Sequence, residues 1–217
     1  MKKADPPLLE VILQLQFDRA ELPKDRVQYF YRMNSDLLPE TGIAEKPQVA
    51  SFQSIDGSDL IAFSEVQSEL RSQIGVSFPR LRSRWTRILD SFLDIFSIPA
   101  VTRVSLSYLN EIPLEDLRSF RSYVNIGFDM PTLLYDRFEF FRSEFTYKYD
   151  FGLIKVWLQP DWDEAMESYC IQLNLLSIHE GLIERSELLF VIQQLHDGIK
   201  DVFRQILSEA YIKQLPQ

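Results

Sequence analysis

The sequence predicts an α+β protein made of two similar halves, each a curved antiparallel sheet with a long covering helix. Two strands with alternating apolar residues, at about 8–17 and 101–112, begin the two halves. Each strand is followed by a short helical stretch, several further strands and a long amphipathic helix. This repeated β-α-β-β-β-α order indicates an internal duplication in which each sheet buries its apolar face under helices.

The composition is typical of a well-packed globular protein. Hydrophobic residues make up 46% of the 217 residues, which is enough apolar material for one large domain or two fused halves. Glycine is scarce at 7 residues and aromatic residues reach 13%, which argues against a low-complexity chain. We expect halves at residues 1–99 and 100–217 that form one compact body, because no flexible linker separates them.

In the first half, residues 8–17 form a strand with one buried face, because apolar residues alternate with mostly polar ones. The dipeptide Asp56-Gly57 predicts a hairpin turn, because glycine tolerates the positive φ of a type I′ turn. Pro79 fits the first turn of a long helix that ends before Pro99. The other elements predicted in this half are a helix at 25–38 and strands at 49–54, 60–66 and 69–77.

The second half opens with the strand at 101–112. Its last helix, from Ser186 to about Leu215, carries an apolar stripe wider than a coiled-coil seam, so we expect it to pack along the sheet. Gly198 within this helix indicates a point of close packing. Aromatic residues crowd the strand at 138–149 and either pack under helices or form an open stacking surface. The remaining predicted elements are a short helix at 114–120 and strands at 123–128, 153–159 and 168–176.

Three motifs resemble a sporadically distributed family of bacterial proteins of unknown function. They are PPLLEVILQLQF at 6–17, RVSLSYLNEI at 103–112 and LHDGIKDVF at 195–203. The family has no established reaction, cofactor or catalytic residue. The resemblance therefore implies a bacterial protein and, by analogy, a defence or toxin–antitoxin type cassette. In element order, the predicted fold also resembles the duplicated saddle of TATA-binding-protein-type domains.

Motifs that carry chemistry are scarce. The glycines are dispersed and form no phosphate-binding loop, and the two histidines lack the spacing of a zinc helix. Cys170 is the single cysteine, so it cannot form an internal disulfide. We expect no cofactor, no metal and no catalytic motif. A carboxylate-based enzyme is the third functional alternative, with acids near strand ends at Glu65, Glu69, Glu139, Glu144, Asp161 and Asp163.

Charge and the N-terminus limit the partners. The formal net charge of -9 disfavours general binding to nucleic acid or an anionic membrane, because the field of the chain repels phosphate. Asp5, Pro6 and Pro7 stand where a signal peptide needs apolar residues, and no apolar run is long enough to cross a bilayer. We expect an acidic cytoplasmic protein without a membrane partner.

An arginine cluster near the start of the helix after Pro79 is the first candidate site. Arg80, Arg84 and Arg87 share one face of this helix, whose positive N-terminal end makes the cluster unfavourable without a nearby anion. The anion is either a carboxylate of the chain itself or a phosphate, a nucleic-acid backbone or an acidic partner. Arg71 and Arg103, on neighbouring predicted strands, are candidates for the same patch.

Two other polar residues complete the candidate sites. Asn110 follows an aromatic-bearing strand at its expected exit from the sheet, so its amide either fixes a turn or holds a ligand. His196 lies beside Asp197 at the boundary of the apolar stripe. This position indicates either a boundary histidine with a hydrogen-bond partner or a metal or acid–base role.

The leading functional interpretation is a non-enzymatic binding protein that recognises a protein partner or a small ligand in the cleft between the halves. Strand edges and the last helix also predict a homodimer. The alternative is a nucleic-acid or nucleotide binder that uses the arginine-rich helix start.

Overall fold

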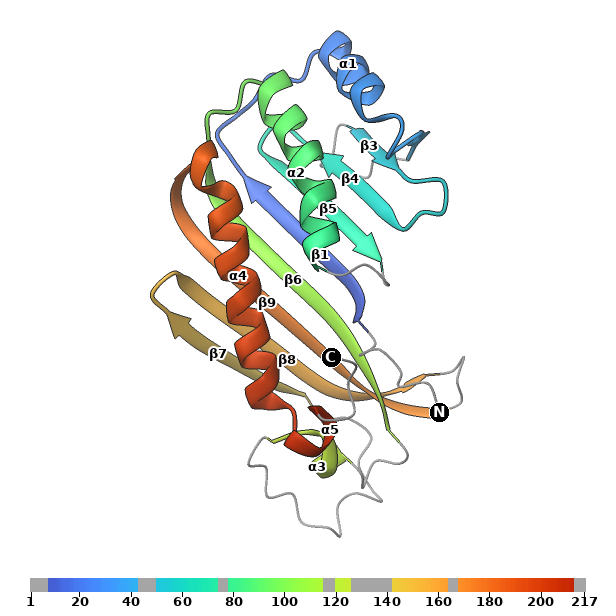
Figure 1. The fold of residues 1–217 in the computed structure, drawn as a ribbon, viewed down its shortest axis with the longest axis vertical. Coiled ribbons are helices and arrows are strands. Elements are labelled where there is room, and N and C mark those ends of the chain that lie inside the picture. The colour runs from blue at the N-terminus through green and yellow to red at the C-terminus, as the bar shows by residue number, and fades with distance from the viewer. Residues whose placement is uncertain are drawn as a thin grey trace.

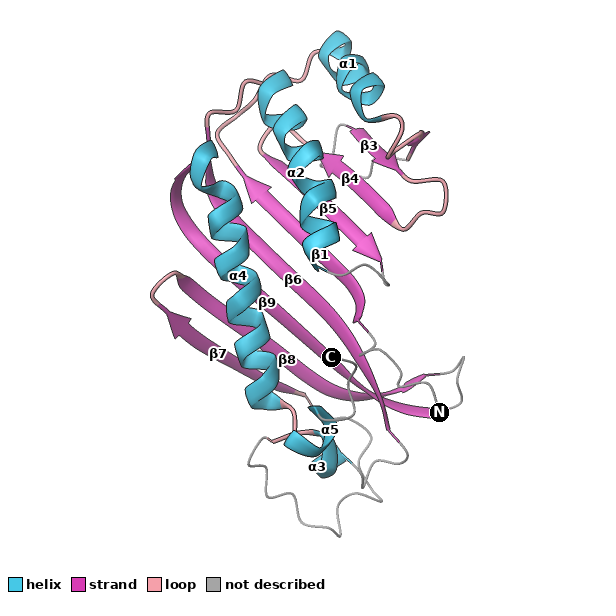
Figure 2. Cartoon of the chain, in the orientation of Figure 1, coloured by secondary structure: helices cyan, strands magenta, loops and turns pink. Residues whose placement is uncertain are grey.

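The computed structural model describes residues 8–42, 50–73, 78–114, 120–125, 142–163 and 168–212. Nine strands form one antiparallel sheet, and the long helices α2 and α4 cross one face of it (Figures 1 and 2). The predicted α+β class is therefore confirmed.

The elements follow in chain order. The strands are β1 (Leu8–Gln16), β2 (Glu40–Thr41), β3 (Ala50–Gln53), β4 (Asp59–Phe63), β5 (Gln67–Gln73), β6 (Ala100–Leu114), β7 (Ser143–Tyr149), β8 (Gly152–Asp163) and β9 (Ser168–Glu184). The helices are α1 (Lys24–Asn34), α2 (Phe78–Ile95), α3 (Phe120–Tyr123), α4 (Arg185–Ile206) and α5 (Glu209–Ile212). Among the described residues, none of the helices is both long enough and apolar enough to span a bilayer.

The two halves meet in the middle of the sheet. The strand order is β2-β3-β4-β5-β1-β6-β9-β8-β7, so β1 and β6 are the central neighbours. Their antiparallel pairing runs from Leu8 opposite Asn110 to Gln16 opposite Arg103. Main-chain hydrogen bonds between β1 and β6 therefore join the two halves into one continuous sheet. The halves can form a groove where their helices meet.

Strand alternation determines which side chains enter the core. Val11, Leu13 and Leu15 of β1 are buried on the face that the helices cover, as the alternation predicts. The opposite face carries Gln14 and Gln16, which are exposed. The predicted apolar stripe of α2 is buried as well, with Leu81, Trp85, Ile88, Leu89 and Phe92 all in the core.

An aromatic cluster joins α1 to the sheet and to α2. Phe30 is fully buried, and its ring centroid lies 5.6 Å from that of Phe63 and 5.9 Å from that of Phe52. The rings of Phe92 and Phe96 at the end of α2 each lie 6.0 Å from it. These spacings fall within the range of favourable aromatic pairs. Phe30 therefore anchors a helix that is otherwise mostly exposed.

The last helix is shorter than predicted. It ends at Ile206, and Leu207 adopts an extended conformation that forms a β-bridge with Val124. The pairing removes Leu207 from the helix, and α5 follows after this break. Gly198 is the close packing point that the sequence predicts, because a Cβ atom there would lie 2.5 Å from the ring of Phe151 and 3.0 Å from Ile154.

Other boundaries in the second half also differ. β6 continues to Leu114, so the helix predicted at 114–120 is wrong at its start. Residues 115–119 lie outside the described residues, and α3 begins at Phe120. The strand predicted at 123–128 is wrong at its start, since Tyr123 ends α3; residues 126–128 are not described. β9 extends beyond the predicted end at residue 176 to Glu184, because it pairs with the full length of β6. The sequence does not indicate this extension, since Gly181 interrupts the alternation of apolar and polar residues.

The aromatic residues of β7 pack into the molecule. Phe145, Tyr147 and Tyr149 are half-buried against the hydrophobic core. Glu144, Thr146 and Lys148 alternate with them and are exposed. The packing interpretation therefore holds for this part of the strand, while Phe138, Phe140 and Phe141 lie outside the described residues.

Replacing Ser97 with glycine is expected to stabilise the protein by about 0.5–1 kcal/mol. Ser97 follows α2 with a φ of 54°, a left-handed conformation that glycine adopts at less cost. The N–H groups of Ser97 and Ile98 donate to the carbonyls of Asp94 and Leu93, which fixes this conformation. Urea denaturation of Ser97→Gly measures the gain, and Ser97→Ala is the control because it keeps a Cβ atom. An equal gain in both variants would contradict the backbone explanation.

Candidate partner-binding site

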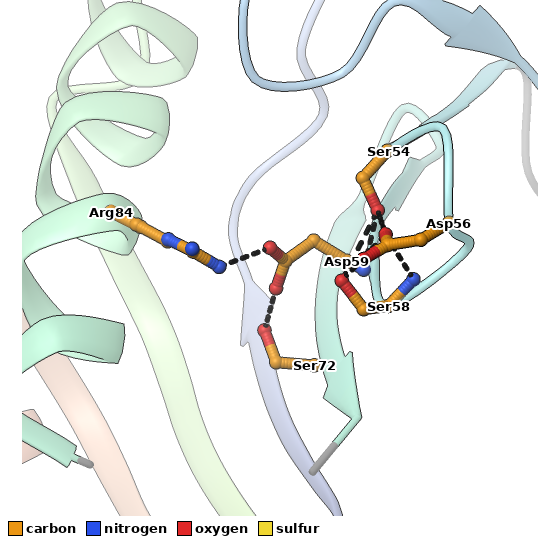
Figure 3. A network of polar contacts seen from close by, with 6 residues as sticks. All are labelled: Ser54, Asp56, Ser58, Asp59, Ser72 and Arg84. Carbon is orange, nitrogen blue, oxygen red and sulfur yellow. Dashed lines mark hydrogen bonds and ion pairs between the residues drawn. The ribbon is translucent and has the colours of Figure 1, made fainter. Parts of the chain in front are cut away.

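Two arginines of the predicted cluster are paired within the chain. Nη1 of Arg84 donates to Asp59 Oδ2 at 2.7 Å, and the Ser72 hydroxyl donates to the other oxygen of Asp59 at 2.5 Å (Figure 3). The guanidinium of Arg87 donates two hydrogen bonds to the carboxylate of Asp36, at 2.7 and 2.8 Å. The hydrogen bonds from Arg87 lower the pKa of Asp36.

Arg80 is the third member of the cluster. It is exposed and has no ion-pair or hydrogen-bond partner among the described residues. The anions that neutralise Arg84 and Arg87 are thus carboxylates of the chain itself. This geometry leaves Arg80 as the member available to an external anion.

Arg71 and Arg103 do not join the cluster. Arg71 lies opposite Ile12 and Arg103 opposite Gln16, so both belong to the face of the sheet away from α2. Nη2 of Arg71 lies 2.7 Å from Glu69, and Nε of Arg103 lies 3.7 Å from Glu180. The prediction of a shared patch is wrong, because residues on opposite faces of one sheet cannot meet.

Asn110 stabilises the sheet. Its side chain is buried, and Nδ2 donates to the carbonyl oxygen of Leu173 in β9 at 3.1 Å. It does not lie at the strand exit, since β6 continues to Leu114. The amide therefore satisfies a buried carbonyl at the pairing of β6 with β9.

His196 lies between the two halves. Its Nδ1 is 2.6 Å from the hydroxyl of Tyr108 on β6, and its ring stacks on Phe78 at a centroid distance of 3.6 Å. Burial lowers the pKa of His196 to about 4 and raises that of Tyr108. Tyr108 therefore stays protonated and shares a hydrogen bond with a neutral imidazole, whose tautomer sets which of the two groups donates. The predicted hydrogen-bond partner is Tyr108 rather than Asp197.

Stability is expected to fall as the pH drops from about 6.5 to about 4 because of His196. The unfolded chain binds a proton in this range that the folded protein does not, so stability is full above pH 6.5. The partial exposure of the ring reduces the expected loss to roughly 1–2 kcal/mol. Asp197 opposes this pKa shift, and Lys200 adds to it.

Urea denaturation at pH 7 and pH 4.5 measures this loss. The His196→Phe variant is the comparison, because the carboxylates that also titrate in this range are unchanged in it. The wild type should lose more stability than the variant. Equal losses would show that the histidine does not contribute.

α2 and α4 lie side by side and run in opposite directions over the sheet (Figure 1). The start of α4 meets the end of α2, where Nη2 of Arg185 donates to Asp94 Oδ2 at 3.1 Å and lies 3.3 Å from Asp90 Oδ1. Further along, Nη1 of Arg82 donates to Gln193 Oε1 at 2.8 Å. These contacts define the helix seam, which joins one helix from each half.

A groove follows the upper part of the helix seam, and we call it the seam groove. Its volume is about 530 Å³, and an adjacent hollow of about 640 Å³ shares Arg185 and Ser186 with it. The seam groove is lined by Leu89, Asp90, Leu93, Arg185, Ser186, Leu188 and Leu189. The hollow is lined by Asp18, Arg19, Ala20, Ser97, Ile98, Pro99, Ala100, Leu182, Glu184, Arg185 and Ser186.

Two large apolar side chains, one just before α4 and one in its first turns, project from the surface. Leu182 is 75% exposed and lines the hollow, and Phe190 is 64% exposed. Phe190 follows Ser186 by one helical turn, so it lies on the same face of α4 as a residue of the seam groove. Exposed apolar side chains next to an apolar groove are typical of protein-binding surfaces.

The rim of the two cavities is acidic. Asp18 and Glu184 line the hollow, are exposed and have no ion-pair partner among the described residues. The two nearby arginines are occupied, since Arg19 lies 2.7 Å from Glu65 and Arg185 binds the acids of α2. The rim therefore favours a partner with positive charge.

The sequence did not identify this site. Leu182 follows Gly181 in a segment that reads as a connection, and Phe190 lies just outside the apolar stripe of its helix. The one available signal was a large apolar residue on the polar side of an amphipathic helix.

Comparisons with known proteins give no functional relative. Neither a protein-family model nor a curated protein matches the chain. Among solved structures, it is similar to the TBP of Methanococcus jannaschii at 10% sequence identity, with 91% of this chain and 99% of that chain covered. The TM-score of 0.33 is too low to support a conclusion about function.

Proposed function

We propose that this protein is a non-enzymatic binding protein that recognises a protein partner at the seam groove. The exposure of Leu182, which lines the adjacent hollow, and of Phe190 on α4 is the observation that carries the proposal. Leaving large apolar side chains in water is unfavourable, and a partner that covers them would recover this cost.

The groove and its rim define the chemistry of the partner. Leucine side chains of α2 and α4 line the seam groove, so an apolar side chain of the partner fits between the helices. The acidic rim and the net charge of -9 favour basic residues around that side chain. The expected partner therefore presents one or more apolar anchors surrounded by lysine or arginine.

The internal duplication is part of the same proposal. Outward from the central pair, the strand order is β1-β5-β4-β3-β2 on one side and β6-β9-β8-β7 on the other, so the short β2 is extra on the first side. β5 is the outer neighbour of β1, and β9 is the outer neighbour of β6. Along the chain, each of these two strands is followed by a long helix, β5 by α2 and β9 by α4. Two copies of one unit joined in this way would place their long helices next to each other, and the seam groove would be built from both.

Affinity capture from the native host with three matched baits tests the function. The baits are the wild type, the double variant Leu182→Asp/Phe190→Asp, and Ile55→Asp. Ile55 is 79% exposed but lies in the loop between β3 and β4, so its replacement controls for the loss of an exposed apolar residue. We expect one protein that the wild type and Ile55→Asp retain and that the double variant loses at least tenfold.

Two results would count against the proposal. A protein retained equally by all three baits would exclude the seam groove as its site. Nucleic acid that co-purifies with the wild type and is lost when Arg80, Arg84 and Arg87 are changed to glutamate would favour the alternative function. The internal pairs of Arg84 and Arg87 give this alternative less support than the seam groove.

A further inference from the structure

The outer edge of β7 is unpaired within the described part of the chain. β7 is the last strand of the sheet and pairs only with β8 there, and Figure 1 places it as the outermost strand beside α4. Natural sheets usually protect such edges, because unpaired N–H and C=O groups bind another strand. β7 spans seven residues and contains no proline.

The alternate residues Glu144, Thr146 and Lys148 direct their main-chain groups outward. Tyr149 and Gly152 flank the turn between β7 and β8 and close the ladder, so their backbone groups face each other. The main-chain N–H and C=O groups of Phe145 and Tyr147 point toward β8 like those of Tyr149, because these groups alternate between the two sides of a strand. The three outward residues are therefore free to form main-chain hydrogen bonds with another strand.

The charges along this edge are self-complementary. Arg142, Glu144, Thr146, Lys148 and Asp150 are all exposed and read positive, negative, neutral, positive, negative. When a second copy of this series runs in the opposite direction beside the first, with Thr146 opposite Thr146, each charged residue lies opposite a residue of the opposite charge. None of the four charged side chains has an ion-pair or hydrogen-bond partner among the described residues.

We propose that β7 pairs with β7 of a second copy of this chain, antiparallel, about a two-fold axis at Thr146. In this register Glu144 of each copy lies opposite Lys148 of the other, and Arg142 lies opposite Asp150 next to the ends of the strands. Two Glu–Lys and two Arg–Asp pairs result, because a two-fold axis repeats every contact. The dimer continues the sheet across both chains.

The same register also fits the covered face of the sheet. Phe145 of each copy lies opposite Tyr147 of the other, on the side where both rings already pack against the core. Aromatic pairs directly opposite each other on neighbouring strands are favourable. A shift of the register by two residues would place Glu144 opposite Thr146 and Lys148 opposite Arg142, which has the same charge, so the charges select one alignment. This surface is separate from the seam groove, and its test does not depend on the proposed function.

Charge exchange tests the register. Sedimentation velocity over a range of concentrations measures the dissociation constant of the full chain and of the variants Glu144→Lys and Lys148→Glu. Each single change places like charges opposite each other, and we expect it to weaken the dimer at least tenfold. An equimolar mixture of the two variants is expected to form heterodimers as tightly as the wild type pairs with itself, because opposite charges then meet again. The double exchange Glu144→Lys/Lys148→Glu should also restore the homodimer.

Two further variants separate this interface from other effects. Thr146→Pro removes an outward N–H group at the centre of the pairing and is expected to abolish the dimer, while the pairing of β7 with β8 loses no hydrogen bond. Circular dichroism checks that each variant is folded. Glu40→Lys reverses a charge on β2 at the opposite edge of the sheet and should leave the dimer unchanged. A monomeric wild type, or a dimer that the single changes do not weaken, would overturn the proposal.

Discussion

Replacing Gly152 with alanine is expected to destabilise the protein by about 3 kcal/mol or more. Gly152 begins β8 with a φ of 147°, a conformation that costs other residues about 1–3 kcal/mol. A Cβ atom there would lie 2.0 Å from the carbonyl oxygen of Ile178 in the neighbouring strand β9. Because this neighbour is backbone, relief requires β8 and β9 to separate, and overpacking of this kind costs a further 1–3 kcal/mol or so.

Gly181→Ala separates the two causes in this prediction. Gly181 has a similar φ of 142°, but its Cβ atom would lie 3.9 Å from the nearest atom, Nε2 of His179. The control should therefore lose only the conformational part of the free energy. Urea denaturation of both variants measures the difference. Equal losses at the two positions would show that the contact with Ile178 has no energetic effect.

Replacing Phe30 with alanine is expected to cost about 3–5 kcal/mol of stability, the usual range for a buried phenylalanine. Phe30 is fully buried among four other phenylalanine rings, and only Asn34 accompanies it as a buried residue of α1. The cavity cannot close easily, because Phe63 and Phe92 are themselves held in the sheet and in α2. The loss is a large part of the 5–15 kcal/mol that stabilises most domains.

Chemical denaturation of Phe30→Ala measures this loss, and Tyr29→Ala is the matched control on the same helix. The Tyr29 side chain is 53% exposed, so its truncation should change the free energy of unfolding by about 0.5 kcal/mol or less. A loss below about 1 kcal/mol in Phe30→Ala would mean that α1 is not anchored by this ring.

Local patterns predicted the central elements of the fold well. The alternation at 8–17 identified the buried face of β1, and the apolar stripe after Pro79 identified the covered side of α2. Predictions were wrong where long-range pairing overrides local preference. Leu207 leaves the helix because it bridges Val124, and the end of β9 is a strand because β6 lies beside it.

The site depended even more on tertiary structure. The sequence identified the arginine cluster, but Arg84 and Arg87 pair with acids 25 and 51 residues away in the chain, and no local pattern reveals such partners. Leu182 and Phe190 are ordinary apolar residues in the sequence. Only the fold determines that both are exposed.

The central position of β1 has a consequence for synthesis on the ribosome. β1 is made well before both of its neighbours in the sheet, β5 and β6. At about 5–20 residues per second, several seconds pass before β5 is available, and β6 emerges later still. During this time an apolar strand has both edges unpaired outside the exit tunnel. The nascent chain should therefore depend on chaperones that bind β1 until the centre of the sheet can close.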